Sequence, residues 1–413
     1  MKFLLKTFGC KLNQYESQLI RENLVSAGLE EVDDLSSGDY VIIASCAVTR
    51  DSVKGMRKFI SSVRAKNPDA KIIVTGCWVN VYPEQVKKIQ PYLALNNTQK
   101  YYLPAYLGKK GFKFKSRISG FKSHHRAFVK IQDGCDNRCS YCCVWMARGK
   151  SYSRSREEIL LEIKDLLSAG YKEIVITGLC IGDYGKDINF SLVGLLSEIE
   201  KLDYEFRIRI SSIEPQDVNE EMIDFLSSSE KVVPHLHIPV QSGSDRILKI
   251  MNRKYDSGSF RNLIRRLKAG NERFQFSTDV IVGFPAEEEK DFLSTVEILR
   301  ELQPVRVHIF PFSPRPRTPA FEFQPRVNPK IIWERKRKLQ EEIHRIIKDN
   351  LNAQVGKEFR VLLERKKNGS WVGYTENYIK CFLESDESLD GEFRDVRLVS
   401  VDDQNLACYV QFI

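Results

Sequence analysis

The sequence lacks any apolar run long enough to span a membrane, although hydrophobic residues make up 42% of its 413 residues. Its first residues, MKFLLKTFGCK, contain neither a long apolar core nor a small-residue cleavage site, so we interpret them as a first strand and not a signal peptide. We therefore expect a cytoplasmic protein without membrane contact. A chain of this length is suited to two or three domains.

Cysteine is scarce outside one short segment. The chain has ten cysteines, and four of them lie in GCDNRCSYCC, residues 134–143. A reducing compartment disfavours disulfides, so ligation of a metal or a cluster is the better explanation for such a group.

Acidic residues are absent from residues 85–132, where basic and aromatic side chains alternate. Together with the formal net charge of +9, this segment is either a solvated linker or an RNA contact that tracks phosphates and stacks on bases. The basic members are Lys109, Lys110, Lys113, Lys115, Arg117, Lys122 and Arg126, and the aromatic ones are Tyr101, Tyr102, Tyr106, Phe112, Phe114 and Phe121.

The first third of the chain alternates strands and helices, and each strand runs into a cysteine. Strands are expected at 2–8, 40–45 and 71–76, and helices at 13–28 and 52–66. The cysteines that follow the strands are Cys10, Cys46 and Cys77. Because ligands collect at the carboxyl ends of parallel strands, we expect these three thiols to converge.

Residues 127–312 repeat a strand–helix unit six times, which predicts an open (β/α)6 partial barrel with its chemistry at the carboxyl ends of the strands. The expected strands are 127–132, 173–178, 207–212, 235–240, 277–283 and 305–311, and helices are expected at 156–170 and 288–302, among others.

A long helix is expected at 329–351, and the last sixty or so residues read as short strands with turns. The chain is therefore predicted to be an α/β protein of three domains. These are an N-terminal Rossmann-like parallel-sheet domain (1–112), a central partial barrel (120–350) and a small all-β domain (351–413).

The cysteines after the first barrel strand are spaced C-x3-C-x2-C, at Cys135, Cys139 and Cys142. Three thiolates without an evident fourth ligand suit a [4Fe–4S] cluster with one open iron, whereas a zinc site normally has four ligands. Cys143 is next to Cys142, so its side chain points elsewhere, and we treat it as a small apolar residue.

This region resembles the radical S-adenosylmethionine enzymes, and Tyr141 occupies a position that those enzymes usually fill with an aromatic residue. The resemblance implies that the open iron binds the amino and carboxylate groups of S-adenosyl-L-methionine. It also implies that an electron from the cluster cleaves this cofactor to a 5′-deoxyadenosyl radical, while the protein supplies position and excludes water.

Further motifs are similar to those of the methylthiotransferases within this class: FGCKLNQYES, SCAVTRDSV, VTGCW, ARGKSYSRSR, HLHIPVQSGSDRILKIMNRKY, TDVIVGFPAE and FPFSPRPRTPA. VGKEFRVLL and GYTENY in the C-terminal module resemble the RNA-binding TRAM domain. The motif GCKLNQYES, together with CIGDYG, most resembles the motifs of the bacterial branch that acts on N6-threonylcarbamoyladenosine beside the tRNA anticodon. Two other branches are alternatives. The branch that acts on isopentenyl-adenosine has a GC-(Q/N)-M-N motif, and the branch that acts on a ribosomal protein has a GCPKN-like motif.

The resemblance implies that Cys10, Cys46 and Cys77 hold a second [4Fe–4S] cluster, which carries the sulfur that is transferred to C2 of the adenine. It also implies three partners: a tRNA anticodon loop, an electron donor of flavodoxin or ferredoxin type, and an unidentified sulfur donor. A non-enzymatic zinc-bearing RNA-binding protein is the alternative from another class.

Residues at the strand ends are candidates for binding the cofactor, although turn chemistry would explain several of them as well. We expect at most one of His235 and His237 to face the barrel interior. Arg148 and Arg154 touch either the cofactor carboxylate or RNA phosphates, or they are surface residues. The strand-end and loop candidates are Tyr141, Thr177, Gly178, Ser211, Ser212, Glu214, Gln241, Ser242, Gly283 and Phe284.

Four residues depart from the family pattern. Trp145 replaces a usual proline, Ala286 and Arg317 replace glycines, and Cys180 replaces an asparagine. If the backbone at Ala286 and Arg317 needs a positive φ, these side chains are strained there. Cys180, with Cys381 and Cys408, is expected to be a buried thiol.

Overall fold

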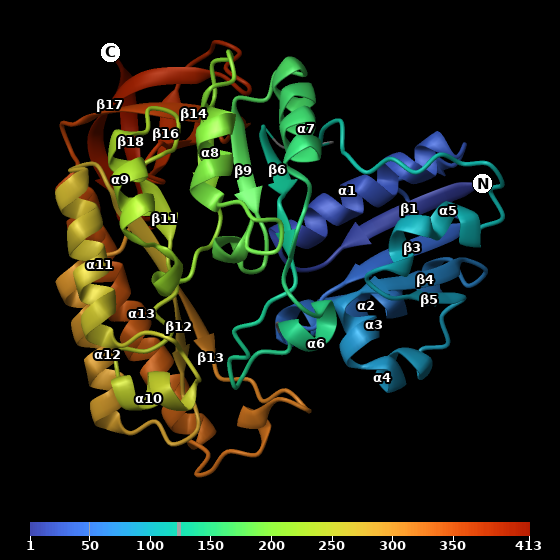
Figure 1. Cartoon of the computed structure of the whole chain (residues 1–413), viewed down its shortest axis with the longest axis horizontal. Helices are drawn as coiled ribbons and strands as arrows, with labels where there is room; N and C mark the ends of the chain where they lie inside the picture. Colours follow the sequence, from blue (N-terminus) through green and yellow to red (C-terminus); the bar gives the residue numbers. More distant parts are fainter. Residues whose placement is uncertain (49, 122–124) are drawn as a thin grey trace.

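The computed structural model describes residues 1–48, 50–121 and 125–413, so Lys122, one of the basic residues expected to contact RNA, lies outside the described residues. Three parts follow one another along the chain (Figure 1): a parallel sheet with helices, a half-open barrel, and a small β-barrel.

The N-terminal sheet has the order β2-β1-β3-β4-β5, and all its neighbouring strands are parallel. Alternate side chains of its central strands enter two separate cores, one under α2 (Arg50–Lys66) and one under α1 (Lys11–Ser26), because successive residues of a strand point to opposite faces. The strands are β1 (Lys2–Thr7), β2 (Glu30–Glu31), β3 (Tyr40–Ser45), β4 (Lys71–Gly76) and β5 (Leu93–Leu95).

The predicted cysteines lie where these strands end. Cys10 precedes α1, Cys46 follows β3, and Cys77 opens the short helix α3 (Cys77–Val81). Gly76 makes the turn into α3 at φ +98°, where a Cβ atom would lie 2.6 Å from the carbonyl oxygen of Ser45. Only glycine fits this close approach of two strands, which brings Cys77 beside Cys46.

The central domain contains six parallel strands in chain order, and the predicted partial barrel is confirmed. A bridge between Ile208 and Val232 joins its two three-stranded halves. In the described part of the chain, no pairing closes the ring between β6 and β13. The strands are β6 (Arg126–Lys130), β9 (Glu173–Thr177), β10 (Arg207–Ile210), β11 (His235–His237), β12 (Gln275–Val282) and β13 (Arg306–Pro311).

Helices cover the outside of this barrel (Figure 1), and the N-terminal domain packs beside β6 through α1, whose Tyr15 and Leu19 join the core of the barrel. The strand predicted at 235–240 stops at His237, and Pro239 in that stretch has no N–H to donate. The covering helices are α7 (Arg156–Ser168), α8 (Leu192–Glu200), α9 (Glu220–Ser228), α11 (Ser257–Gly270), α12 (Glu289–Leu302) and α13 (Pro329–Asn352).

The C-terminal module is a closed five-stranded barrel that sits on the N-terminal ends of the central strands (Figure 1). The guanidinium of Arg207, on β10, donates to the carbonyl oxygens of Arg360 and Tyr374 at 3.2 and 3.0 Å. The strands of this module are β14 (Glu358–Lys367), β15 (Ser370–Thr375), β16 (Lys380–Glu384), β17 (Phe393–Asp402) and β18 (Ala407–Phe412). Within the described residues, no helix combines the length and the apolar character that crossing a membrane requires.

The basic and aromatic segment is not a free linker. The amide of Asn23, on α1, donates to the carbonyl oxygen of Lys115 at 3.0 Å and accepts from its N–H at 2.8 Å. Ile118 is buried in the core of the barrel. Tyr102 and Phe114 remain exposed, with their ring centroids 5.8 Å apart.

Candidate active site

Cys10, Cys46 and Cys77, the first triad, come together although they are far apart in the sequence. Burial, with a smaller contribution from the nearby thiols of Cys77 and Cys46, raises the pKa of the Cys10 thiol to about 11, although Arg148 opposes this shift. Cys10 remains accessible to solvent, whereas Cys46 and Cys77 are buried.

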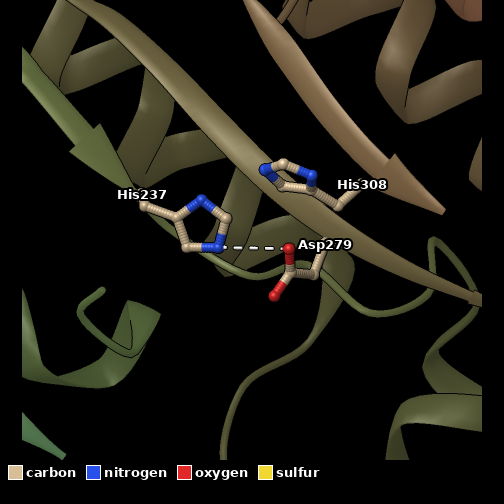
Figure 2. A group of neighbouring side chains, drawn as sticks. All are labelled: His237, Asp279 and His308. Atoms are coloured by element: carbon tan, nitrogen blue, oxygen red, sulfur yellow. Dashed lines mark ion pairs between the residues drawn. The ribbon is translucent and has the colours of Figure 1, made fainter. Parts of the chain in front are cut away.

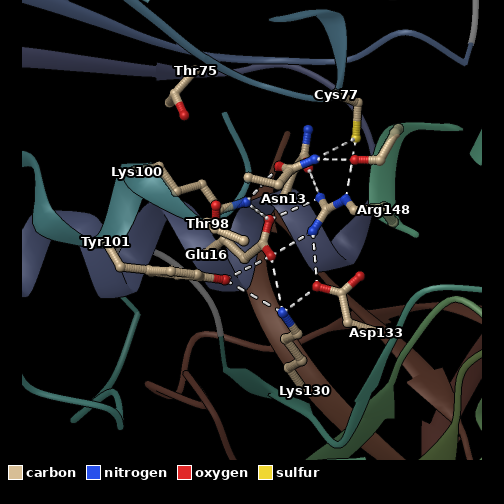
Figure 3. A network of polar contacts seen from close by, with 12 residues as sticks. Asn13, Glu16, Thr75, Cys77, Thr98, Lys100, Tyr101, Lys130, Asp133 and Arg148 are labelled. Atoms are coloured by element: carbon tan, nitrogen blue, oxygen red, sulfur yellow. Dashed lines mark hydrogen bonds and ion pairs between the residues drawn. The ribbon is translucent and has the colours of Figure 1, made fainter. Parts of the chain in front are cut away.

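Arg148 fixes the first triad to the barrel (Figure 3). It lies at the end of the short helix α6 (Val144–Arg148) and is buried. Its Nε donates to Cys77 Sγ at 3.3 Å, and its two terminal nitrogens donate to Glu16 Oε1 at 2.6 Å and Asn13 Oδ1 at 2.8 Å. The surface role considered for Arg148 is therefore wrong.

The same network brings buried lysines from both domains onto one carboxylate. Glu16 on α1 contacts Lys100 at 2.5 Å and Lys130 at 3.1 Å, and Lys130 also contacts Asp133 at 2.5 Å (Figure 3). Burial alone would raise the pKa of the Glu16 carboxyl, but Arg148 and the two lysines hold it well below its usual range. Charge pairing thus locks the N-terminal domain against the loop that follows the first barrel strand.

Cys135, Cys139 and Cys142, the second triad, lie on the loop between β7 (Gln132–Asp133) and α6. Gly134 opens this loop at φ +75°, and a Cβ atom there would lie 1.8 Å from the carbonyl oxygen of Lys150. Burial raises the pKa of the Cys142 thiol well above its usual value, and the Cys139 and Cys135 thiols raise it further.

Arg253 is a neighbour of the second triad that sequence reasoning missed. It donates to Cys139 Sγ at 3.2 Å and forms an ion pair with Glu214, one of the predicted cofactor residues. It follows the helix α10 (Asp245–Ile250) by three residues, and no local pattern indicates that it reaches the cysteine loop.

Cys142 and Cys143 point toward different triads. The buried Cys143 thiol lies 3.7 Å from the carbonyl oxygen of Ala47, the residue after Cys46, and packs in the same apolar cluster as Cys77. Burial, together with the thiols of Cys77 and Cys46, raises the pKa of Cys143 to about 11. Adjacent residues of one chain therefore face the two triads, so both lie at the same place between the N-terminal domain and the barrel. The prediction that Cys143 points away from Cys142 and is a small buried residue agrees with this placement.

Cys180, Cys381 and Cys408 are buried, as predicted. Cys180 lies beside the second triad, and hydrogen bonding between its thiol and that of Cys135 raises the pKa of Cys180 and lowers that of Cys135. Asn137 Nδ2 donates to Cys180 Sγ at 3.4 Å. The departure from the family pattern at Cys180 thus touches the cysteine loop directly.

The other candidates for binding the cofactor divide into accessible and enclosed residues. Ser212 is exposed and Glu214 is half-buried, while Tyr141 packs edge-on against Phe284 with a centroid distance of 6.2 Å. Ser242 and Phe284 are fully enclosed by protein. Thr177, Ser211 and Gln241 are buried at strand ends, Gly178 lies against Gln132, and Gly283 lies against Ile332.

The chemistry of the donor set tests whether these residues fit an iron–sulfur cluster. Each triad offers three cysteine thiols, and an arginine donates to one thiol of each, Arg148 to Cys77 and Arg253 to Cys139. A structural zinc site normally has four ligands. Three thiolates instead fit a cubane in which each binds a different iron and one iron stays open.

Polar side chains also line the interior of the barrel, and they correct one expectation. Both His235 and His237 face inward, because residues two apart on a strand share a face. Their ring nitrogens lie 3.1 and 2.9 Å from Ser277 Oγ. His237 Nε2 lies 3.2 Å from Asp279 Oδ1, with His308 beside them (Figure 2).

Three families match successive parts of the chain. Residues 2–96 match the Uncharacterized protein family UPF0004, residues 129–299 the Radical SAM superfamily, and residues 352–407 the TRAM domain.

Relatives match almost the whole length of the chain. The threonylcarbamoyladenosine tRNA methylthiotransferase MtaB of Thermotoga maritima is 38% identical over 97% of this chain and 95% of its own. The enzyme of the same name from Bacillus subtilis is 34% identical over 95% of this chain and 92% of its own. A tRNA-2-methylthio-N(6)-dimethylallyladenosine synthase of Hydrogenobaculum is 30% identical over the full length of both.

Solved structures show the same fold at low sequence identity. The radical S-adenosylmethionine methyltransferase TsrM of Kitasatospora setae superposes with a TM-score of 0.59 at 14% identity, over 78% of this chain and 75% of that one.

Proposed function

The chain belongs to the radical S-adenosylmethionine tRNA methylthiotransferases, and we propose that it converts N6-threonylcarbamoyladenosine beside the tRNA anticodon to its 2-methylthio derivative. This membership makes the chain an enzyme and excludes the non-enzymatic zinc-bearing alternative. Membership in the radical SAM superfamily also implies a [4Fe–4S] cluster and S-adenosyl-L-methionine.

The observation that supports the proposal is that Cys143, next to Cys142 of the second triad, packs with Cys77 of the first, while Arg148 of the same segment donates to Cys77. Cys135, Cys139 and Cys142 would hold the cluster that binds S-adenosyl-L-methionine, and Cys10, Cys46 and Cys77 would hold a second one. When bound, these groups supply a carbon radical and a sulfur atom, because acid–base chemistry alone cannot replace the strong C2–H bond of adenine.

The protein's own residues position these groups. Arg148 and the buried ion network hold the first triad against the barrel. Arg253 ties Cys139 to Glu214 at the end of the third barrel strand. The adenine must leave its stack to reach this site, which costs less in an anticodon loop than in a duplex.

Two surfaces suit the tRNA. The exposed rings of Tyr102 and Phe114 lie within the segment that lacks acidic residues, and such rings stack on unpaired bases while lysines contact phosphates. The C-terminal barrel matches an RNA-binding domain type. A flavodoxin- or ferredoxin-type electron donor, a sulfur donor and a cytoplasmic location complete the proposal.

Mass spectrometry of nucleosides from bulk tRNA tests it. A strain lacking this gene should lose the 2-methylthio form of N6-threonylcarbamoyladenosine and accumulate the unthiolated nucleoside, and the plasmid-borne gene should restore the product. Loss of the methylthio-isopentenyl nucleoside instead would overturn the substrate and favour the dimethylallyl branch. Loss of neither, with a modified ribosomal protein changed, would favour the third branch.

A further inference from the structure

The interior of the barrel contains two cations without a carboxylate partner. Lys11, next to Cys10, and Arg306, the first residue of β13, have no ion pair within 4 Å among the residues that the structure describes. The other interior arginines share carboxylates: Arg207 and Arg209 bind Glu173 at 2.5 and 2.8 Å, and Arg126 binds Glu364 at 2.5 Å.

The charges of both cations act on the same tyrosine, Tyr378. The Arg306 guanidinium lies 5.0 Å from the ring centroid of Tyr378, a residue of the C-terminal barrel that stacks on His235 at 4.6 Å. Lys11, Arg306 and Arg126 hold the pKa of the Tyr378 hydroxyl below its usual value, although burial alone would raise it. Lys11 begins α1 directly after Cys10, and from the N-terminal domain its charge acts on the same tyrosine as that of Arg306.

One wall of this space leads from the cations toward the catalytic end. Arg306, His308 and Phe310 lie two residues apart along β13, so their side chains share its inner face. From the start of the strand to its end, this face carries a guanidinium, then an imidazole and then a phenyl ring. Phe310 is 40% exposed, so its ring is available to a planar ligand.

The neighbouring His237, Asp279 and His308 have the composition of a metal site (Figure 2). The positive charges near these three residues argue against a metal site. Lys11 and Arg306 both act on His308, lowering its pKa together with burial, and they would repel a divalent cation placed beside it. The positive charges of Lys11 and Arg306 would instead attract an anion.

We propose that Lys11 and Arg306 bind the carboxylate of the N6-threonylcarbamoyl side chain and thereby select this nucleoside over the dimethylallyl one. C2 and N6 lie on the same edge of adenine, so a base that presents C2 near Cys10 brings its N6 substituent beside Lys11. The threonyl carboxylate is an anion, whereas a dimethylallyl group is apolar and would leave both half-buried cations unpaired. This inference rests on the proposed function and adds the residues that determine specificity.

Binding and turnover on matched RNAs test the inference. Reconstituted protein is titrated with anticodon stem-loops that carry either N6-threonylcarbamoyladenosine or its neutral threonine-amide analogue, and fluorescence anisotropy gives both dissociation constants. The wild type should prefer the carboxylate by about tenfold or more, the factor that a charge-assisted hydrogen bond supplies. Lys11→Gln and Arg306→Gln should each reduce this preference several-fold, with affinity for the amide unchanged. Lys164→Gln, the same change at an exposed position of α7, should leave the preference intact.

The outcomes separate the two proposals. If the wild type thiolates the carboxylate RNA but neither variant alters the preference, the cation pair is overturned and the proposed function stands. If the wild type thiolates only a dimethylallyl stem-loop, both are overturned. Iron content and circular dichroism of each variant confirm folding, and the two substitutions lie on different domains, so a defect in one leaves the other as a test.

Discussion

The Nε atom of Arg148 donates to the Sγ atom of Cys77 at 3.3 Å, and this contact joins the cysteine loop of the barrel to a strand end of the N-terminal sheet. The same guanidinium pairs with Glu16 and Asp133. One buried side chain thus holds a thiol, a helix and a loop that belong to two domains.

Replacing Arg148 by methionine should destabilise the chain by about 3–5 kcal/mol, because Glu16 and Asp133 would lose a buried countercharge. Chemical unfolding followed by tryptophan fluorescence measures this. Arg156→Met removes an arginine whose ion pairs are solvent-exposed, and it should cost less than about 1 kcal/mol. Equal losses in the two variants would contradict a structural role for the network.

Replacing Cys10, Cys46 and Cys77 together by alanine should remove about half of the iron, from about eight to about four atoms per chain. The variant should still cleave S-adenosyl-L-methionine, since the second triad is intact, but it should form no methylthio product. Iron and sulfide analysis, with chromatography of the cleaved cofactor, measures both. The reciprocal alanine variant of Cys135, Cys139 and Cys142 should keep iron and lose cleavage. Full iron in either variant would argue against two separate clusters.

Gly134→Ala should prevent formation of the cluster site at Cys135, Cys139 and Cys142. A methyl group there meets the Lys150 carbonyl at 1.8 Å, so the cysteine loop must shift. Gly149 has the same φ of +75°, but a methyl group added there would meet open space, so Gly149→Ala isolates the backbone strain alone. We expect the absorbance and iron of the cluster to fall in the first variant and to persist in the second.

Ala286→Gly should stabilise the chain by about 1 kcal/mol. Ala286 adopts φ +63°, a left-handed conformation that strains a residue with a Cβ atom. Ala169, at φ −81° after α7, is the control, because glycine there only adds freedom to the unfolded chain and should destabilise. Urea unfolding of the three proteins gives the comparison, and destabilisation by both glycines would contradict the strain.

Asp217→Asn should gain stability relative to the wild type as the pH rises. Burial raises the pKa of the Asp217 carboxyl from 3.8 to about 6, with help from Asp183 and Glu214. The folded chain therefore binds this proton more tightly than the unfolded chain, and wild-type stability falls between about pH 4 and about pH 6. Unfolding of metal-free protein across this window should show a relative gain of about 2–3 kcal/mol for the variant. A constant difference would refute the shifted pKa.

Local patterns predicted the scaffold well. The bounds of β3 and β4 agree with the apolar runs 40–45 and 71–76, since buried strands of a parallel sheet need continuous apolar residues. The positive φ at Ala286 and Arg317 confirms the expectation drawn from the family pattern.

Contacts between segments that are distant in the chain could not be predicted from the sequence. Arg253 at Cys139 and Arg148 at Cys77 each join residues from different elements, and no spacing along the chain encodes such contacts. The prediction that at most one of His235 and His237 faces the barrel interior was wrong, because side chains two residues apart on a strand share one face.

The C-terminal barrel is fastened to the central one partly through main-chain oxygens. Arg207 donates to the carbonyls of Arg360 and Tyr374, and Arg209 donates to those of Thr375 and Glu376. Every amino acid carries such an oxygen, so these four hydrogen bonds do not depend on which side chain the acceptor residue has. Side chains add ion pairs between the two barrels, Arg126 with Glu364 and Arg360 with Glu205. A substitution in the outer module can therefore remove one of these ion pairs while the backbone-mediated part of the attachment persists.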